Sequence, residues 1–241
     1  MPGLGTLINC AGVLAGGILG LLLKKGLAPR FQQILMSACG LSILFLGISG
    51  ALEEIFVIAE DGLTSQGTMM IIFSLCAGAL TGEALNIEAA AEQLGAFLRQ
   101  KTGNAKDARF VDGFVSTSLT ICIGAMAVVG SIQDGLQGDP SMLSVKAVLD
   151  LIIVFVMTSS LGKGCIFSII PLGIFQGTMT ALAGFLEPVL IPQAVSNMSL
   201  VGSMMIFCVG VNLMFQQKIR VANFLPALAF AVLAAFLPVL Q

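Results

Sequence analysis

Residues 142–164 read MLSVKAVLDLIIVFVMTSSLGKG, and this stretch decides how the rest of the chain is interpreted. It is long enough to cross a bilayer as one helix, because about 20 residues span the roughly 30 Å of hydrocarbon. It nevertheless carries Lys146 and Asp150, which stand four residues apart and therefore share one helical face. Charged side chains at membrane depth are costly, so they usually face a bundle interior or a water-filled cavity. We therefore expect this helix to be the functional one.

The composition of the whole chain agrees with a membrane protein. Of its 241 residues, 57% are hydrophobic and 10% are charged, and the mean hydropathy is +1.02. Soluble domains carry about 25% charged residues, so this chain is suited to lipid. A net charge of −2 without a basic patch argues against a nucleic-acid partner. The chain has no histidine and its six cysteines form no CxxC pair, so we expect no metal or other cofactor.

The hydrophobic runs predict an all-α polytopic helix bundle that forms a single transmembrane domain over residues 1–241. About eight spans are expected, at 4–23, 31–52, 67–85, 110–132, 142–161, 165–186, 196–215 and 221–240. The start of the chain lacks a basic region before its apolar run, so we expect the first span to be retained. Residues 86–101, NIEAAAEQLGAFLRQK, place Ile87, Ala91, Leu94 and Leu98 on one side and the charges elsewhere, which predicts a helix on the cytoplasmic interface.

The basic residues predict the orientation in a bacterial inner membrane. Ten of the eleven follow the first, third, fifth or seventh span: Lys24, Lys25, Arg30, Arg99, Lys101, Lys106, Arg109, Lys163, Lys218 and Arg220. The other loops carry acidic residues instead: Glu53, Glu54, Glu60, Asp61, Asp134, Asp139 and Glu187. This alternation follows the positive-inside rule and predicts that both termini lie outside the cytoplasm. Lys146 is the exception, which draws attention to it.

Internal similarity suggests helix-pair repeats. Residues 16–35 align with 78–98 as a parallel repeat, and residues 29–47 align more weakly with 192–210 in inverted orientation. The candidate repeats cover 5–50, 67–131 and 165–215. Inverted repeats are typical of secondary transporters, whose binding sites lie near the bilayer midplane.

Glycines spaced by four residues predict close helix packing. Gly12, Gly16 and Gly20 form two GxxxG steps, and Gly78 with Gly82 forms another. Small residues at this spacing let two helix backbones approach. The contact can be intramolecular, or it can join copies of the chain into a homo-oligomer.

Polar residues within the spans are the candidates for a substrate or ion site. Asn9 lies in the first span and Glu83 near the end of the third. Gln176 lies in the sixth span between Pro171 and Gly177. Because proline removes a backbone donor and glycine weakens a helix, we expect a broken helix there, with exposed backbone groups that hold an ion or solute. The structural alternative for Asn9 and Gln176 is an amide that bridges two helices, and for Glu83 it is a carboxylate near the water boundary that is solvated or paired with a nearby Lys or Arg.

Asp150 is the strongest candidate. If Lys146 extends to the outer surface, Asp150 is left alone in the membrane and can carry a proton or bind a cation. The alternative is an ion pair in which Lys146 and Asp150 satisfy each other and only stabilise the fold.

Several runs of the sequence resemble an uncharacterised bacterial membrane family, the YdfK- and YqgA-like proteins, often labelled as transport proteins. The runs are GTLINCAGVLAGGILGLLL, GALTGEALNIE, ICIGAMAVVGSIQDGLQGD, SVKAVLDLI, GIFQGTMT and VANFLPAL. Within them, the resemblance features Asn9, Gly82, Glu83, Gly130, Asp134, Gly135, Lys146, Asp150, Gln176, Gly177, Asn223 and Pro226. It brings no substrate and no residue role with it.

The sequence therefore favours a secondary transporter or channel-like carrier of a small solute or ion. A membrane scaffold that assembles through glycine faces is the second hypothesis, and it requires a dry interior in which Asp150 binds Lys146. An enzyme is not expected, because no HExxH motif, Ser–His or Cys–His pairing, or phosphate-binding GxxxxGK[ST] loop is present.

Overall fold

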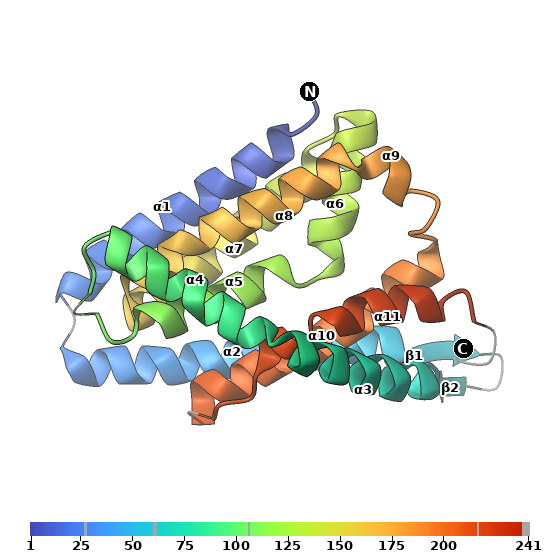
Figure 1. Ribbon diagram of the computed structural model, residues 1–241, viewed down its shortest axis with the longest axis horizontal. Coiled ribbons are helices and arrows are strands. Elements are labelled where there is room, and N and C mark those ends of the chain that lie inside the picture. The colour runs from blue at the N-terminus through green and yellow to red at the C-terminus, as the bar shows by residue number, and fades with distance from the viewer. Residues whose placement is uncertain (27, 60–61, 106, 216, 238–241) are drawn as a thin grey trace.

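The computed structural model describes residues 1–26, 28–59, 62–105, 107–215 and 217–237 (Figure 1). The first half contains α1 (Leu4–Gly26), α2 (Pro29–Ile55), α3 (Thr68–Leu85), α4 (Ile87–Lys101), α5 (Phe110–Cys122) and α6 (Ala125–Gln137). The second half contains α7 (Ser141–Leu161), α8 (Ile169–Ala181), α9 (Ala183–Leu186), α10 (Pro192–Phe215) and α11 (Pro226–Ala234), with 3₁₀ turns η1 (Lys163–Ser168) and η2 (Val221–Phe224). A hairpin of β1 (Phe56–Ala59) and β2 (Gly62–Ser65) follows α2. The predicted all-α membrane bundle is confirmed.

The number of spans differs from the expected eight. Within the described residues, six helices are long and apolar enough to cross a membrane, and the bent pair α5 and α6 makes a seventh if it is counted as one broken span. The continuous span expected over 110–132 is wrong, because the chain bends by 61° between α5 and α6. At the break Ile123 is extended and Gly124 has a φ of 141°, which residues with a side chain rarely adopt.

The eighth expected span, over 221–240, is not one long helix among the described residues. It consists of the turn η2 and the nine-residue α11, which is about 14 Å long and too short to span alone. Pro226 begins α11, where its missing N–H costs no helical hydrogen bond. Residues 238–241 of the expected span lie outside the described residues.

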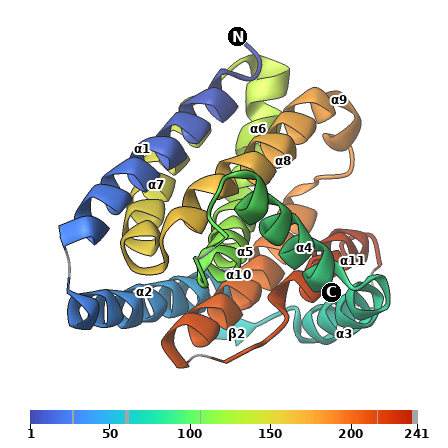
Figure 2. The same cartoon turned by 60° about the vertical axis from the view of Figure 1, so that its left-hand side comes forward.

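Helices α1 and α7 run parallel and in close contact (Figure 2). A Cβ atom on Gly12 would lie 2.7 Å from the carbonyl oxygen of Ala147, and one on Gly20 would lie 2.6 Å from that of Phe155. Gly16 meets the backbone of Leu151 even more closely. The GxxxG steps of the first span are thus used within the chain, as the intramolecular alternative expected, and they hold α7 against α1.

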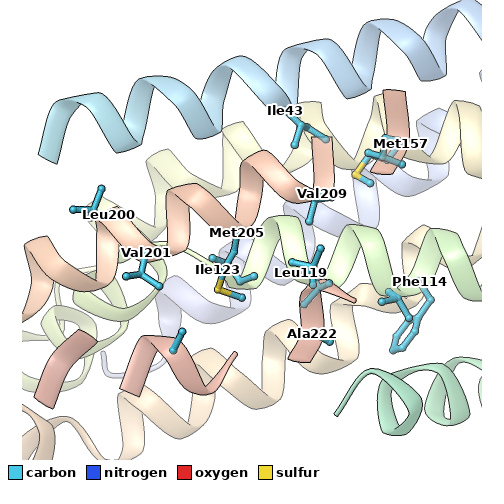
Figure 3. Packing of buried hydrophobic residues seen from close by; sticks show 14 of the residues in the cluster. Ile43, Phe114, Leu119, Ile123, Met157, Leu200, Val201, Met205, Val209 and Ala222 are labelled. Carbon is cyan, nitrogen blue, oxygen red and sulfur yellow. The ribbon is translucent and has the colours of Figure 1, made fainter. Parts of the chain in front are cut away.

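Helices α2 and α10 form the second close pair, and they run antiparallel. Gly40 packs against Met214, and Gly47 packs against Phe207. Gly78 and Gly82 of α3 pack in the same way against α11 and η2. Between these pairs lies the main apolar core, to which α5, α7 and α10 contribute Leu119, Met157, Met205 and Val209, among others (Figure 3).

The interfacial segment forms the predicted helix, α4. Three of the four side chains expected on its apolar side pack against the core: Ile87, Ala91 and Leu98. The fourth, Leu94, is 42% exposed, contrary to the expectation. Gly95 is the buried residue of α4 instead, and a Cβ there would lie 3.0 Å from the Phe114 ring of α5.

The ends of the bundle differ in charge. The loops after α1, α4, α7 and α10 gather at one end, which we call the basic end (Figure 1). There Lys24 lies against Gly162, and Lys163 donates to Asn104 Oδ1 at 3.0 Å. The turns after α2, α6 and α9 lie at the opposite, acidic end. Of the loop charges named above, Lys106, Glu60 and Asp61 lie outside the described residues.

Asp134 of α6 closes the acidic end against α1. Its side chain is fully buried, and Oδ2 accepts hydrogen bonds from the backbone amides of Gly3 at 3.1 Å and Gly5 at 3.0 Å. The first amides of a helix lack helical partners and carry partial positive charge, so they favour an anion. Asp134 therefore fixes the start of α1, and with it the depth of the residues that follow.

Candidate functional site

Lys146 and Asp150 form an ion pair inside the bundle. Lys146 Nζ donates to Asp150 Oδ2 at 2.5 Å, and the two residues are 7% and 3% exposed. Asp150 is the tenth of the 21 residues of α7, about 13 Å from the start of the helix. The pair therefore lies near the middle of a span. Lys146 does not extend to the outer surface, so the arrangement with a lone Asp150 is not the one observed.

The break between α5 and α6 supplies a third member of this site. Lys146 Nζ also donates to the backbone carbonyl of Ile121, at 2.8 Å. Because α5 ends at Cys122, its last carbonyls have no helical partner and carry partial negative charge. The ammonium group thus lies between a carboxylate and a helix C-terminus, both of which favour a cation.

Asn9 of α1 borders the ion pair. Its side chain is fully buried and lies beside Asp150. Neither Nδ2 nor Oδ1 has a hydrogen-bond partner at bonding geometry among the described residues. This position follows from the packing of α1 on α7, because Gly12, one turn further on, contacts Ala147.

Gln176 of α8 is a second fully buried amide whose polar atoms, Nε2 and Oε1, have no hydrogen-bond partner among the described residues. Helix α8 runs antiparallel to α1 (Figures 1 and 2), and a Cβ on Gly173 would lie 3.4 Å from Cys10 Sγ. Gln176, one turn after Gly173, is therefore held near the first half of α1, the half that carries Asn9.

The helix break expected between Pro171 and Gly177 is wrong. Helix α8 is continuous from Ile169 to Ala181. Pro171 is the third residue of α8, and a proline in the first turn removes an amide that would have no helical partner. The sequence placed the broken helix in the wrong span: the break lies at Ile123 and Gly124, with its free carbonyl next to Lys146.

Glu83 belongs to a different place, the basic end. Its Oε1 lies 2.6 Å from Arg220 Nη1, and its Oε2 accepts a hydrogen bond from Asn223 Nδ2 at 2.6 Å. Asn223 Oδ1 in turn accepts from the backbone amide of Glu88 at 2.7 Å. The carboxylate is exposed and paired with arginine, as the structural alternative for Glu83 expected. This network ties the junction of α3 and α4 to η2.

A cleft of about 990 Å³ opens next to this network. Its wall carries acidic and basic side chains: Glu83, Glu88, Glu92, Asp112, Arg109, Lys218 and Arg220. Burial and the nearby Glu92 raise the pKa of the Glu88 carboxyl, although the amide of Ala222 donates to it at 2.8 Å. A smaller cavity of about 130 Å³ lies at the acidic end, beside Glu54, Gln66 and Gln193.

The cleft extends along α5 as far as Ser116, and neither the ion pair nor the two buried amides are among the residues that line it. Val115 and Ser116 of α5 line it, together with Leu161 and Leu213 from α7 and α10. Ile121, whose carbonyl binds Lys146, is five residues after Ser116, or about 7.5 Å along the helix. One side of α5 thus contacts a polar opening, and its end contacts the buried charges.

Unpaired polar atoms are uncommon in folded proteins, because each buried donor or acceptor without a partner costs about 1–3 kcal/mol. Asn9, beside Asp150, and Gln176 together present four such atoms. Leu172, one turn before Gln176, packs in one cluster with Ile121 and with Val154, one turn after Asp150, which places Gln176 on the side of α8 that faces the pair. A solute or ordered water that pairs with them would remove this cost. Among the described residues, no group of three or more cysteine, aspartate or glutamate side chains converges as a metal site.

Comparison with known proteins agrees with this architecture. Residues 4–236 match the model of a family described as a protein of unknown function, DUF554. The chain belongs to this family. One relative is the uncharacterised membrane protein YdfK of Bacillus subtilis, which is 27% identical over 93% of this chain and 92% of YdfK. Another is the uncharacterised protein YqgA of Escherichia coli, which is 30% identical over 95% of this chain and 94% of YqgA. No solved structure matches.

The membership confirms the resemblance drawn from the sequence runs. Among the residues that the runs feature, Asp134 fixes α1 and Asn223 links the elements at the basic end. Lys146, Asp150 and Asn9 form the buried site. Sequence reasoning missed the Ile121 carbonyl, because a backbone group leaves no mark in the sequence, and Gly124 was the only signal of the break.

Proposed function

We propose that this DUF554 protein is a carrier that moves a small solute or ion across the bacterial cytoplasmic membrane. The basic end faces the cytoplasm in this proposal, as the positive-inside rule requires, and the N-terminus lies outside. The chain is not an enzyme in this proposal. The buried ion pair beside two amides without partners is the observation that carries it.

Two further features support a carrier. Helix ends at mid-depth expose backbone carbonyls or amides, and transporters use such ends to bind ions and solutes. The break at Gly124 provides these ends, with Ile121 as the carbonyl on one side. The cleft of about 990 Å³ leads in from the basic end, whereas the cavity at the acidic end is about 130 Å³. This difference is what a carrier open to the cytoplasm would have.

Coupling in this carrier involves the pair rather than a lone carboxylate. Lys146 and Asp150 are each bound in the structure, so a ligand has to separate them or bind alongside them. A separated pair would leave two charges without compensation unless the ligand supplies partners. The pair thus works as a gate that opens only when the correct ligand is present.

The test is reconstitution in proteoliposomes, with proton and solute flux measured for wild type and for Asp150→Asn. We expect the variant to lose most of the flux, since Lys146 then lacks its counter-charge and the ion pair cannot re-form after each transport cycle. Ser42→Ala is the matched control, because Ser42 is exposed on α2 and bonds only its own helix, at Ala38. Equal flux in wild type and Asp150→Asn would remove Asp150 from the mechanism.

A membrane scaffold is the second candidate, and specific observations favour it. Asp150 is bonded to Lys146, and the glycine seams between helices are tight, as in a packed bundle without transport. The scaffold leaves the unpaired amides of Asn9 and Gln176 without a role, whereas a ligand site explains them. If no solute or proton flux depends on the protein, the scaffold is the better account.

A further inference from the structure

We propose that the buried site binds a small zwitterion, a molecule with one carboxylate and one ammonium group such as an α-amino acid. This inference rests on the proposed carrier function and names its substrate class. Three observations carry it: the opposed charges of Lys146 and Asp150, the donors and acceptors of the two amides, and the mixed charge of the cleft.

Charge balance at the ion pair is the first argument. Both ions are buried, and each has the other as its counter-charge at 2.5 Å. A simple cation that bound Asp150 would displace Lys146 and leave the ammonium inside the bundle without a counter-charge, bonded only to the Ile121 carbonyl among the contacts described. A simple anion that bound Lys146 would leave Asp150 unpaired in the same way. A zwitterion offers its carboxylate to Lys146 and its ammonium to Asp150, so both charges stay compensated.

Hydrogen bonding is the second argument. Gln176 presents an amide donor and a carbonyl acceptor without a partner among the described residues, and Asn9 presents a second amide directly beside Asp150. Lys146 has three N–H donors and two acceptors, Asp150 and Ile121. The site therefore offers donors to a carboxylate and acceptors to an ammonium group. A metal ion would use only the acceptors and a halide only the donors.

The cleft at the basic end is the third argument. Four acidic and three basic side chains line it, so neither sign of charge dominates this opening at the cytoplasmic side of the proposed carrier. Paths selective for one kind of ion usually carry rings of a single sign. A zwitterion can enter an opening of mixed charge without net repulsion, and the cleft, at about 990 Å³, has room for a small solute.

Ligand-induced stabilisation of the purified protein tests the class. Each of the twenty proteinogenic amino acids is added, and the midpoint of thermal unfolding is measured against concentration. For any amino acid that binds, its deaminated and decarboxylated analogues are compared; for L-alanine these are propionate and ethylamine. We expect at least one amino acid to bind, and each single-charge analogue to bind at least tenfold more weakly.

Gln176→Leu separates binding from folding. The substitution removes two unpaired polar atoms at nearly constant volume, so the unliganded variant should unfold at the wild-type temperature or above. Its affinity for the amino acid should nevertheless fall at least tenfold. Ser42→Ala should change neither quantity.

The outcomes distinguish this proposal from the carrier function. If no amino acid binds, or if a single-charge analogue binds as tightly, the zwitterion class is overturned. Asp150-dependent flux of another solute in proteoliposomes would then show that the carrier survives. If an amino acid binds but is not moved, the ligand class stands and the carrier function fails.

Discussion

Removing either partner of the buried ion pair should destabilise the protein, by amounts that the structure ranks. In Asp150→Asn, Lys146 loses its counter-charge but keeps the Ile121 carbonyl at 2.8 Å. In Lys146→Met, Asp150 loses its counter-charge and the Ile121 carbonyl also loses its donor. Breaking a buried pair costs about 3–5 kcal/mol, and a buried carbonyl without a donor adds about 1–3 kcal/mol. We therefore expect Lys146→Met to cost more than Asp150→Asn.

The double variant Lys146→Met/Asp150→Asn completes the cycle. Because it contains no unpaired charge, it should be more stable than either single variant, with a coupling energy of about 3 kcal/mol or more. That energy corresponds to a factor of more than about a hundred in the unfolding equilibrium. The assay is reversible unfolding in lipid nanodiscs or bicelles at fixed lipid composition.

The exposed pair of Glu83 and Arg220 is the matched control. Their side chains are 57% and 62% exposed, so Arg220→Gln should cost at most about 1 kcal/mol. If Asp150→Asn and Lys146→Met cost no more than this control, the central pair is hydrated in solution. Lys146 and Asp150 would then not form a desolvated pair, contrary to their 7% and 3% exposure in the structure.

Three further predictions concern packing, capping and pH. Gly16→Ala should destabilise the bundle by several kcal/mol, because its Cβ would meet the backbone of Leu151. Gly184 faces open space, so Gly184→Ala should be nearly neutral. Thermal unfolding of the two variants checks this. Asp134→Ala should cost about 1–3 kcal/mol and speed amide hydrogen exchange in the first turn of α1, and unchanged exchange would contradict the capping role. Glu88 has a higher pKa in the folded state than in the unfolded state. Between these two pKa values the folded state therefore binds more protons, so stability falls as pH rises through this window and Glu88 ionises. Glu88→Gln should therefore unfold at a higher temperature than wild type near pH 7, and the difference should vanish near pH 4; a constant difference would contradict this sign.

Much of the fold could be predicted from the sequence because apolar length and glycine spacing act locally. Runs of about 20 apolar residues identified the long helices, since lipid requires every backbone group to be paired within the segment. The GxxxG steps at Gly12, Gly16 and Gly20 identified a close helix contact. That α7 is the partner helix could not be predicted. Glycine spacing indicates that another helix backbone approaches, but it does not identify that helix.

The candidate site was predicted in part. Lys146 and Asp150 were identified because charges within an apolar run are rare, and their spacing already fixed the shared face. The position of the helix break was misjudged, because Pro171 attracted attention although it fits the first turn of α8. Gly124 has no special neighbour in the sequence, and only its φ of 141° reveals its role. The contact between Lys146 and the Ile121 carbonyl depends on how three helices meet, which no local pattern encodes.

Aqueous access to the centre of the bundle tests the central claim most directly. Cys122 ends α5 beside the ion pair, and its modification by a charged, membrane-impermeant methanethiosulfonate can be quantified by mass spectrometry in vesicles of either orientation. Cys76 is an internal control, because it is exposed in the middle of the α3 span, where lipid excludes a charged reagent. The carrier predicts modification of Cys122 from the basic side, faster than that of Cys76. The variant Ser116→Cys places a cysteine in the cleft and serves as a positive control for labelling. If Cys122 stays unmodified from both sides under conditions that label this variant, the interior is sealed and the carrier function is contradicted.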